Sequence, residues 1–262
     1  ELRPHRKPFI QKYVSQGRLF IGPWYTQPDM FLAGGESLVR NLLIGSHIAE
    51  SMGHCMNVGW IPDAFGQIEK TPQLFKKFGF DGIFAWRGFD YENINDSIFK
   101  WKAPNGDTLL TVHFPLGYGY YRYLPLDAKK AYEDICDTID KTKDRFKDGQ
   151  VLFMGGSDYA VPKNHIPQAI ESIHQKLHDE GYDIEMSNPE KYMHEVKKSL
   201  QENQREVQIY QGEARSAALG RIHAGISSTR VDIKNAMKYS ENILATMGQP
   251  WSVCTSYLGG QD

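Results

Sequence analysis

An apolar run ends at one acidic residue in the stretch Val58-Gly59-Trp60-Ile61-Pro62-Asp63-Ala64-Phe65-Gly66-Gln67. Residues 55–60 have the composition of a buried strand, and an aromatic residue, a glycine and a helical pattern follow Asp63. In α/β proteins, ligands bind at the carboxyl ends of the strands, so Asp63 is well placed to act on a substrate. Asp is also a common helix-capping residue, and on spacing alone capping or turn formation is the favoured role of Asp63. Other residues of the sequence are needed to distinguish a role of Asp63 in substrate chemistry from a role in helix capping or turn formation.

Helical and strand-like segments alternate around this stretch. Residues 36–52 carry apolar or small residues at i, i+4, i+7, i+11 and i+14, which predicts one buried face of a helix. A short helix over residues 71–78 follows the first strand, and residues 80–86 have the pattern of a second buried strand, which ends at Arg87. The alternation predicts an α/β domain with parallel strands and with helices packed outside them.

The second half of the chain repeats the pattern of a strand followed by an acid. Asn105-Gly106 lies between two strand-like runs and predicts a β-hairpin. Residues 115–125 form a loop rich in glycine and tyrosine, of the kind that often lines a site. Residues 150–154 have the pattern of a further strand, and Gly155-Gly156-Ser157-Asp158 follows directly. In a parallel layout, Asp158 and Asp63 would point to the same rim of the sheet.

Asp63 and Asp158 form a candidate catalytic pair. Glycoside hydrolysis needs two carboxyl groups, one that attacks the sugar carbon or activates water and one that protonates the leaving oxygen. The pattern alone is weak support, because many acids at strand ends only bind turn amides. Arg87 could stabilise a carboxylate or a substrate hydroxyl, although a salt bridge at the sheet edge is its favoured role without further information.

Aromatic residues and histidines supply the remaining candidates. Phe65 and Trp60, beside Asp63, could stack on the face of a sugar, but core aromatics would give the same pattern. His174 and His178 are spaced i, i+4 on a predicted helix, which is a spacing of metal ligands. Gln175 stands where a zinc protease has its glutamate, and the helix is otherwise charged. A solvated helix face is therefore the favoured interpretation of the two histidines.

Charge and composition exclude several classes of function. The chain has 262 residues with 30 Lys and Arg against 32 Asp and Glu, which gives no electrostatic case for binding nucleic acid or an anionic membrane. No apolar run approaches the roughly 20 residues of a membrane span. The three cysteines are far apart and lack Cys-x-x-Cys spacing, so we expect neither a disulfide framework nor a cysteine zinc site, and we expect a reducing, cytoplasmic location. They are Cys55, Cys136 and Cys254.

The composition and the hydrophobic pattern of the chain change near Gly212. Residues 213–226 are irregular and rich in small side chains, and residues 229–247 have a helical pattern with Ile233, Met237, Leu244 and Met247 on one face. We therefore expect an α/β domain over residues 1–211, and a linker with the start of a helical domain over residues 212–262. The chain opens with Glu inside a helical pattern, so we also expect it to be a fragment of a longer protein.

Several blocks of this sequence resemble one enzyme family. Residues 59–67 are similar to the Trp-x-x-Asp-x-Phe-Gly motif of glycoside hydrolase family 38, the α-mannosidases. Other blocks fit the family in the same order: Gly17-Arg18-Leu19, Ile21-Gly22-Pro23-Trp24-Tyr25, Glu36-Ser37-Leu38-Val39-Arg40-Asn41, Phe80-Asp81-Gly82-Ile83-Phe84-Ala85-Trp86-Arg87 and Gly155-Gly156-Ser157-Asp158. The resemblance spans nearly the whole chain, and it is strongest to the bacterial branch, which includes mannosylglycerate hydrolases.

The resemblance implies a site and a mechanism. The family has a catalytic domain in the form of a distorted barrel of parallel strands, followed by a helical domain, and it hydrolyses α-mannosides with retention around a zinc ion. Asp63 would be both the nucleophile and a zinc ligand, and Asp158 would be the acid/base, with the two carboxyl groups about 5–6 Å apart. Arg87 would hold the nucleophile or the substrate, and Phe65 and Tyr159 would bind the sugar. The substrate would be an α-mannoside or a small carbohydrate like mannosylglycerate, and a homo-oligomer is compatible with the resemblance.

The chain also departs from the family. Zinc ligation there needs an N-terminal His-x-Asp pair and a histidine of the helical domain, and of these ligands only Asp63 is present. Catalytic zinc sites supply about three protein ligands, so we expect zinc in the full-length enzyme and an inactive fragment that lacks the first strand. Two alternatives stay open: a metal-dependent carbohydrate deacetylase, in which Asp63 would be a general base, and a non-catalytic carbohydrate-binding segment.

Overall fold

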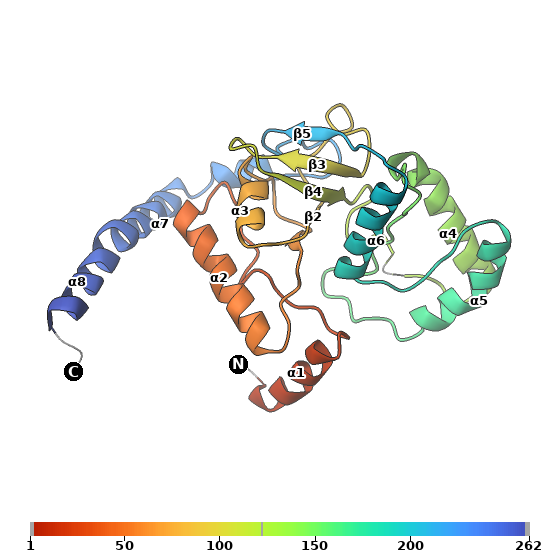
Figure 1. Ribbon diagram of the computed structural model, residues 1–262, viewed down its shortest axis with the longest axis horizontal. Helices are drawn as coiled ribbons and strands as arrows, with labels where there is room; N and C mark the ends of the chain where they lie inside the picture. Colours follow the sequence, from red (N-terminus) through yellow and green to blue (C-terminus); the bar gives the residue numbers. More distant parts are fainter. Residues whose placement is uncertain (1–2, 122, 260–262) are drawn as a thin grey trace.

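The computed structural model describes residues 3–121 and 123–259, and Figure 1 shows how their helices and strands are arranged. The helices are α1 (Lys7–Ser15), α2 (Gly35–Ser51), α3 (Thr71–Lys77), α4 (Ala128–Thr142), α5 (Ile166–Asp179), α6 (Pro189–Glu202), α7 (Val231–Ile243) and α8 (Gln249–Gly259). The strands are β1 (Gly59–Ile61), β2 (Ile83–Ala85), β3 (Ile98–Lys102), β4 (Thr108–His113) and β5 (Ile209–Gln211). Short helical turns lie at Pro4–Arg6, Lys143–Arg145, Ala224–Ser227 and Leu244–Gly248.

The strands form one sheet in the order β1-β2-β4-β3-β5. β1, β2 and β4 run parallel to one another, with Ile61 opposite Ala85 and Ala85 opposite His113. β3 pairs with β4 in the antiparallel sense across the Asn105-Gly106 turn, which confirms the predicted hairpin. β5 is parallel to β3. The predicted α/β class is therefore confirmed, with its parallel strands on the side of the sheet that carries Asp63.

The sheet is buried on both faces. In β2, Ile83, Phe84 and Ala85 are all at most 1% exposed, so no side of this strand meets solvent. Ile83 and Ala85 belong to a core that includes residues of α2 and α3, whereas Phe84 belongs to a core that includes residues of α6. Figure 1 shows α2 and α6 on opposite sides of the sheet. A strand covered on both faces has a continuous apolar sequence, which is why residues 80–86 predict a buried strand.

α2 confirms its predicted face. Leu38, Leu42, Gly45 and Ala49 are the buried residues of this helix, at the spacing that the sequence predicts. Gly45 lies against the backbone of the loop before the helix, and a Cβ at this position would be 2.2 Å from the backbone nitrogen of Tyr25. The absence of a side chain at Gly45 therefore lets this loop cross α2 directly, next to the strand ends.

One predicted strand is wrong, and one strand was missed. Residues 150–154 belong to no strand of the described chain, although they contain many apolar residues. Apolar composition indicates burial, but a strand also needs a neighbouring strand with which to share a hydrogen-bond ladder. β5 was not predicted, because its pattern is short and two of its three side chains are exposed.

The C-terminal helices differ from the rest in their burial. α4 and α5 pack against each other around a third core, whereas α7 and α8 contain no buried residue. Figure 1 shows α7 and α8 extending away from the sheet. The predicted apolar face of this segment, with Met237 and Met247 among its members, is therefore exposed in the described chain. Within the described ranges, no helix is both long and apolar enough to cross a membrane.

Candidate active site

Asp63 and Arg87 meet beyond the carboxyl ends of two adjacent parallel strands. Ile61 ends β1, Ala85 ends β2, and these two residues are opposite each other in the ladder. Asp63 and Arg87 each lie two residues further along, so the register of the strands brings them together. Nε and Nη2 of Arg87 both donate to Oδ1 of Asp63 at 2.6 Å. The Asp63 side chain is 39% exposed and that of Arg87 is 12% exposed. The largely buried guanidinium therefore binds the carboxylate and leaves part of it accessible to a ligand.

The guanidinium of Arg87 is enclosed by three further groups. Its central carbon lies 4.0 Å from the ring centroid of Trp86 and 5.4 Å from that of Phe65. Nη1 donates to the carbonyl oxygen of Arg221 at 2.5 Å. An arginine that is stacked and bonded in this way has few free rotations left, so it fixes the orientation of the Asp63 carboxylate.

Phe65 forms a half-buried wall next to Asp63. Its backbone N–H donates to Oδ1 of Asp29 at 3.2 Å, which fixes the turn that follows Asp63. Its ring meets the ring of His223 nearly edge to face, with 4.9 Å between the centroids and 67° between the planes. Phe65 therefore contacts both His223 and Arg87 close to the Asp63 carboxylate.

Two glycines let a distant segment cross the strand ends. Gly66 and Gly88 have φ angles of 107° and 99°, which favour glycine, and a Cβ at Gly88 would lie 2.3 Å from the carbonyl oxygen of Ala214. Ala214 exchanges two backbone hydrogen bonds of 3.0 Å with Gln67, and Ser216 donates to the carbonyl of Gly88 at 2.8 Å. Residues 214–216, which we call the crossing segment, thus cover both strand ends and lead the chain towards Arg221 and His223.

Asp158 is bonded to a tyrosine of the loop that follows β4. The hydroxyl of Tyr118 donates to Oδ1 of Asp158 at 2.8 Å. Burial, the hydrogen bond to Asp158 and the charges of Asp63 and Asp158 together raise the pKa of Tyr118 to about 12, and the charge of Arg87 opposes them. The hydroxyl of Tyr118 is therefore within electrostatic range of both candidate carboxylates and of Arg87.

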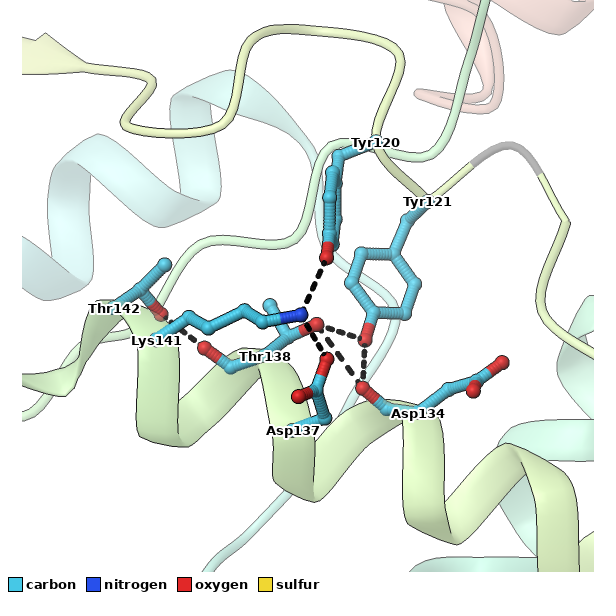
Figure 2. Close-up of polar contacts among 7 residues, drawn as sticks. All are labelled: Tyr120, Tyr121, Asp134, Asp137, Thr138, Lys141 and Thr142. Atoms are coloured by element: carbon cyan, nitrogen blue, oxygen red, sulfur yellow. Dashed lines mark hydrogen bonds and ion pairs between the residues drawn. The ribbon is translucent and has the colours of Figure 1, made fainter.

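The loop that carries Tyr118 is fastened to α4. The hydroxyl of Tyr121 lies 2.6 Å from both the carbonyl oxygen of Asp134 and Oγ1 of Thr138, as Figure 2 shows. Lys141 donates to the hydroxyl of Tyr120 at 3.4 Å and also pairs with Asp137 (Figure 2). The backbone N–H of Tyr121 also donates to the carbonyl of Met154, at 3.0 Å, just before the segment that contains Asp158. The position of Tyr118 is thus fixed between α4 and this segment.

The structure brings together most, but not all, of the predicted site residues. Arg87 contacts both Asp63 and Phe65. Asp158 is bonded to Tyr118, whose hydroxyl also experiences the charges of Asp63 and Arg87. Tyr159 has a φ angle of 56°, and its side chain is fully exposed.

Sequence reasoning missed several residues of the site. Tyr118 had a general signal, because the loop rich in glycine and tyrosine was noted as one that lines a site. Asp29 and His223 had no signal, because they approach Phe65 from segments that are remote in the sequence.

The described residues do not by themselves fit a zinc ion. In the parts of the chain that the structure describes, no three His, Cys, Asp or Glu side chains converge as a metal site. Both bonds from Arg87 go to Oδ1 of Asp63, so this carboxylate could offer its other oxygen as one ligand. One carboxylate falls short of the three protein ligands of a typical catalytic zinc site.

Comparisons with known proteins agree with this geometry. Residues 1–213 match the family described as "Glycosyl hydrolases family 38 N-terminal domain", so the chain belongs to glycoside hydrolase family 38. It is 27% identical, over 95% of its length, to a mannosylglycerate hydrolase-like protein of Halalkalibacterium halodurans, and 28% identical, over 61% of its length, to an α-mannosidase of Saccharomyces cerevisiae. The crystal structure of an α-mannosidase from Enterococcus faecalis superposes on 82% of the chain with a TM-score of 0.74 and 27% identity.

The chain is shorter than these relatives. It spans 29% of the H. halodurans protein, 15% of the yeast enzyme and 24% of the E. faecalis chain. The matched part contains Asp63 and Arg87 at the strand ends and Asp158 on its loop. The family and the fold are therefore established for this chain.

Proposed function

We propose that this chain carries the two catalytic carboxylates of an α-mannosidase that works with retention at the anomeric carbon. Membership of family 38 supports the hydrolysis of glycosidic bonds, and the names of the relatives support mannose as the sugar. The observation that carries the proposal is the ion pair of Asp63 with Arg87. It holds a partly exposed carboxylate in one orientation at the carboxyl ends of parallel strands, where α/β enzymes place their chemistry.

In the first step, Asp63 attacks the anomeric carbon of the mannoside. The bond between this carbon and the leaving oxygen breaks, and Asp158 gives its proton to that oxygen. The sugar is then joined to Asp63 through an ester bond. Because Nε and Nη2 of Arg87 both bind Oδ1 of Asp63, the carboxylate is held in one orientation for this attack.

In the second step, Asp158 acts as the base. It takes a proton from water, the water oxygen attacks the anomeric carbon, and the ester bond to Asp63 breaks. Two displacements at the same carbon give net retention. Tyr118 donates to Oδ1 of Asp158, so it orients the carboxyl group that must serve first as an acid and then as a base. The predicted separation of about 5–6 Å between the carboxyl groups of Asp63 and Asp158 belongs to the same mechanism.

Three side chains would surround the sugar. Phe65 offers its half-buried ring beside Asp63, and Arg87 supports both groups. Tyr159, with its fully exposed side chain, is proposed to close on the sugar when the substrate is bound. A mannosylglycerate-like substrate is the finer form of this proposal, and its support is the relative from H. halodurans.

Asp63 is the one zinc ligand that we propose for the described residues. This residue would supply one carboxylate oxygen, and the other ligands would have to come from outside the described residues. When bound, the ion would orient the sugar hydroxyls and stabilise charge. A cytoplasmic location is also part of the proposal, and the free thiols of Cys55, Cys136 and Cys254 support it.

The test uses the intact enzyme and two α-mannosides, one with a dinitrophenyl leaving group and one with a sugar leaving group. We expect Asp63→Asn to lower turnover of both by about 1,000-fold or more, since it removes the nucleophile. We expect Asp158→Asn to lower turnover of the second substrate by about 100- to 10,000-fold. With the first substrate, the ester on Asp63 should accumulate and be detectable by mass spectrometry, because the base of the second step is missing.

The matched control is Asp140→Asn, which removes an exposed carboxylate of α4 that pairs with Lys143. This variant should keep the activity of the wild type. Near wild-type turnover by Asp63→Asn would reject the proposal. Release of acetate from an acetylated sugar, without mannoside hydrolysis, would favour a deacetylase, and sugar binding without turnover in any variant would favour a binding segment.

A further inference from the structure

The indole of Trp86 lies between the two side chains that hold the candidate carboxylates. Trp86 directly follows β2 and precedes Arg87. The central carbon of the Arg87 guanidinium lies 4.0 Å from the ring centroid of Trp86. The ring of Tyr118 meets the same indole nearly edge to face, with 5.6 Å between the centroids and 76° between the planes. Arg87 binds Asp63 and Tyr118 binds Asp158, so one side chain contacts the hydrogen-bond partner of each carboxylate.

Both contacts depend on the aromatic character of Trp86. A guanidinium is attracted to the face of an indole by the negative charge density of the π system. Aromatic pairs prefer an edge-to-face arrangement, in which the positive edge of one ring meets the negative face of the other. These preferences fix directions as well as distances, so the indole orients Arg87 and Tyr118 relative to each other. An aliphatic side chain would fill much of the same space and lose this orientation.

The backbone of two further segments encloses the indole. A Cβ at Gly117, in the loop that carries Tyr118, would lie 2.8 Å from Cζ2 of Trp86. A Cβ at Gly220, on the stretch that leads from the crossing segment to Arg221, would lie 3.2 Å from Cε2 of Trp86. Because these two glycines bring the backbone directly against the ring, the indole has little room to rotate.

The position of Trp86 is set by ring contacts and not by its polar atom. Nε1 of Trp86 is buried, and it has no hydrogen-bond partner among the residues that the structure describes. The N–H of a buried tryptophan usually finds such a partner. The substitution Trp86→Phe therefore removes no hydrogen bond of the described residues, and it keeps an aromatic face for the guanidinium.

We propose that Trp86 is a positioning residue that aligns Asp63 and Asp158 with each other, through Arg87 and Tyr118. The proposal rests on the roles proposed above for the two carboxylates. In the first step, one carboxylate must reach the anomeric carbon while the other reaches the leaving oxygen, so their relative placement decides the rate. A misplacement of about 1 Å can slow such a reaction by about 100-fold.

A purely structural role is the alternative, because Trp86 also packs against the core that contains Phe84 and Phe114. Loss of core packing lowers the free energy of unfolding, but it does not change kcat of the enzyme that remains folded. Loss of alignment instead lowers kcat and kcat/KM by the same factor, because only the transition state needs both carboxylates in place. The two roles can therefore be separated by kinetics.

The experiment measures kcat and KM of the intact enzyme on the dinitrophenyl mannoside and on the mannoside with a sugar leaving group. We expect Trp86→Leu to lower kcat on both substrates by about 10- to 100-fold, with KM changed by less than about 3-fold. Both substrates are affected because the nucleophile and the acid/base lose their alignment together, whereas Tyr118→Phe should act mainly on the poor leaving group. Trp86→Phe should recover kcat to within about 5-fold of the wild type, because it keeps the aromatic face.

Two matched controls accompany these variants. Leu177 is fully buried in the core between α4 and α5, so Leu177→Ala should unfold at a lower urea concentration and keep its kcat. Gly220→Ala presses a methyl group against Trp86, whereas Gly225 has no atom within 4 Å of its Cβ position. We expect Gly220→Ala to lower kcat by about 3- to 10-fold and Gly225→Ala to keep it. The glycine pair also carries the test if Trp86→Leu does not fold.

Wild-type kcat in Trp86→Leu would overturn the proposal, and so would equal kcat in the two glycine variants. Equal losses in Trp86→Phe and Trp86→Leu would show that the aromatic face is not what matters, and would also overturn it. A similar loss of kcat in Leu177→Ala would assign the effect to stability, against the proposal. Failure of the proposed function is a separate result, because it would appear as near wild-type turnover by Asp63→Asn.

Discussion

Tyr118 connects the two carboxyl groups of the site through one hydroxyl. It donates to Asp158 at 2.8 Å, and the charges of Asp63 and Arg87 also act on it. Burial, followed by these carboxylates, raises the pKa of Tyr118 to about 12. The hydroxyl therefore stays protonated, and remains a donor, throughout the neutral range.

We predict that Tyr118→Phe lowers kcat in the intact enzyme more for poor leaving groups than for good ones. The variant keeps the ring, which packs against Trp86 with 5.6 Å between the centroids, and loses only the bond to Asp158. A hydrogen bond to a charged group contributes about 1.5–3 kcal/mol, so we expect a loss of roughly 10- to 100-fold on a disaccharide. Equal losses on both classes of leaving group would contradict a role through Asp158.

Among the residues of the site, those that belong to a sequence motif can be predicted. Those that reach the site only through the fold of the chain cannot. Asp63 and Arg87 follow strand-like runs, so the rule that parallel strands end at one rim predicts that they meet. His223 and the carbonyl of Arg221 reach Phe65 and Arg87 because the crossing segment leads them there, and no local pattern encodes that path.

At the scale of the elements, the packing of the crossing segment against the ends of β1 and β2 depends on glycine. Gly88 has a φ angle of 99°, and a Cβ there would meet the carbonyl oxygen of Ala214 at 2.3 Å. The crossing segment can pair with the backbone of Gly88 only because that side chain is missing.

We therefore predict that Gly88→Ala lowers the free energy of unfolding by about 3 kcal/mol and also lowers activity. The cost combines the strain of a positive φ angle, about 1–2 kcal/mol, with displacement of the crossing segment. Gly149→Ala is the matched control, since Gly149 has a φ angle of 80° and no atom within 4 Å of its Cβ position. Urea denaturation of both variants checks the prediction, and equal losses would contradict it.

β4 ends in a buried titratable residue. His113 is fully buried, and the ring of Phe89 packs against it with 5.7 Å between the centroids. Burial, together with the charge of Arg145, lowers the pKa of His113 to about 4. In the unfolded chain a histidine titrates near 6.5, so between these values the unfolded chain binds a proton that the folded chain does not.

The free energy of unfolding is therefore expected to fall as the pH is lowered through this range. The contribution of His113 to stability is complete above pH 6.5 and is lost as the pH falls to about 4, with a total on the order of 3 kcal/mol. We predict that His113→Leu flattens the fall in unfolding free energy between pH 7 and pH 4, as measured by urea denaturation. His47→Gln, at an exposed position of α2, should keep the wild-type slope. A slope unchanged in His113→Leu would show that other groups cause the fall.

The elements also show where prediction from sequence ends. α2 is predicted correctly because its period is a local property, and the same four residues that recur in the sequence are buried. Residues 150–154 are as apolar as a strand, but whether they form one depends on a partner elsewhere in the chain. The α/β class survives these errors because it depends on the order of the elements.

In the molecule as a whole, α7 and α8 are joined to the body by few groups. Glu241 accepts from the backbone N–H of Gly34 at 3.3 Å and from the hydroxyl of Ser37, at the N-terminus of α2. A carboxylate at this end of a helix is favoured by the helix dipole, typically by about 0.3–1 kcal/mol. Arg40 adds a bond to Gln249.

We predict that α7 and α8 exchange their amide hydrogens faster than α2, because neither helix buries a residue. Glu241→Ala should increase exchange in α7 and in the first turn of α2, and leave α4 and α5 unchanged. Mass spectrometry of peptides after exchange measures each helix separately. Equal protection of α2 and α7 in the wild type would contradict the prediction.

The crossing segment also has a consequence for biosynthesis. Ala214 leaves the ribosome 126 residues after Gly88, which is roughly 6 to 25 s at 5–20 residues per second. During that interval Asp63 and Arg87 are already made, while the strand ends lack the backbone that later covers them. The strand ends are thus covered only when residues 214–216 have been translated, and a ribosome that stalls before then releases a sheet without this cover.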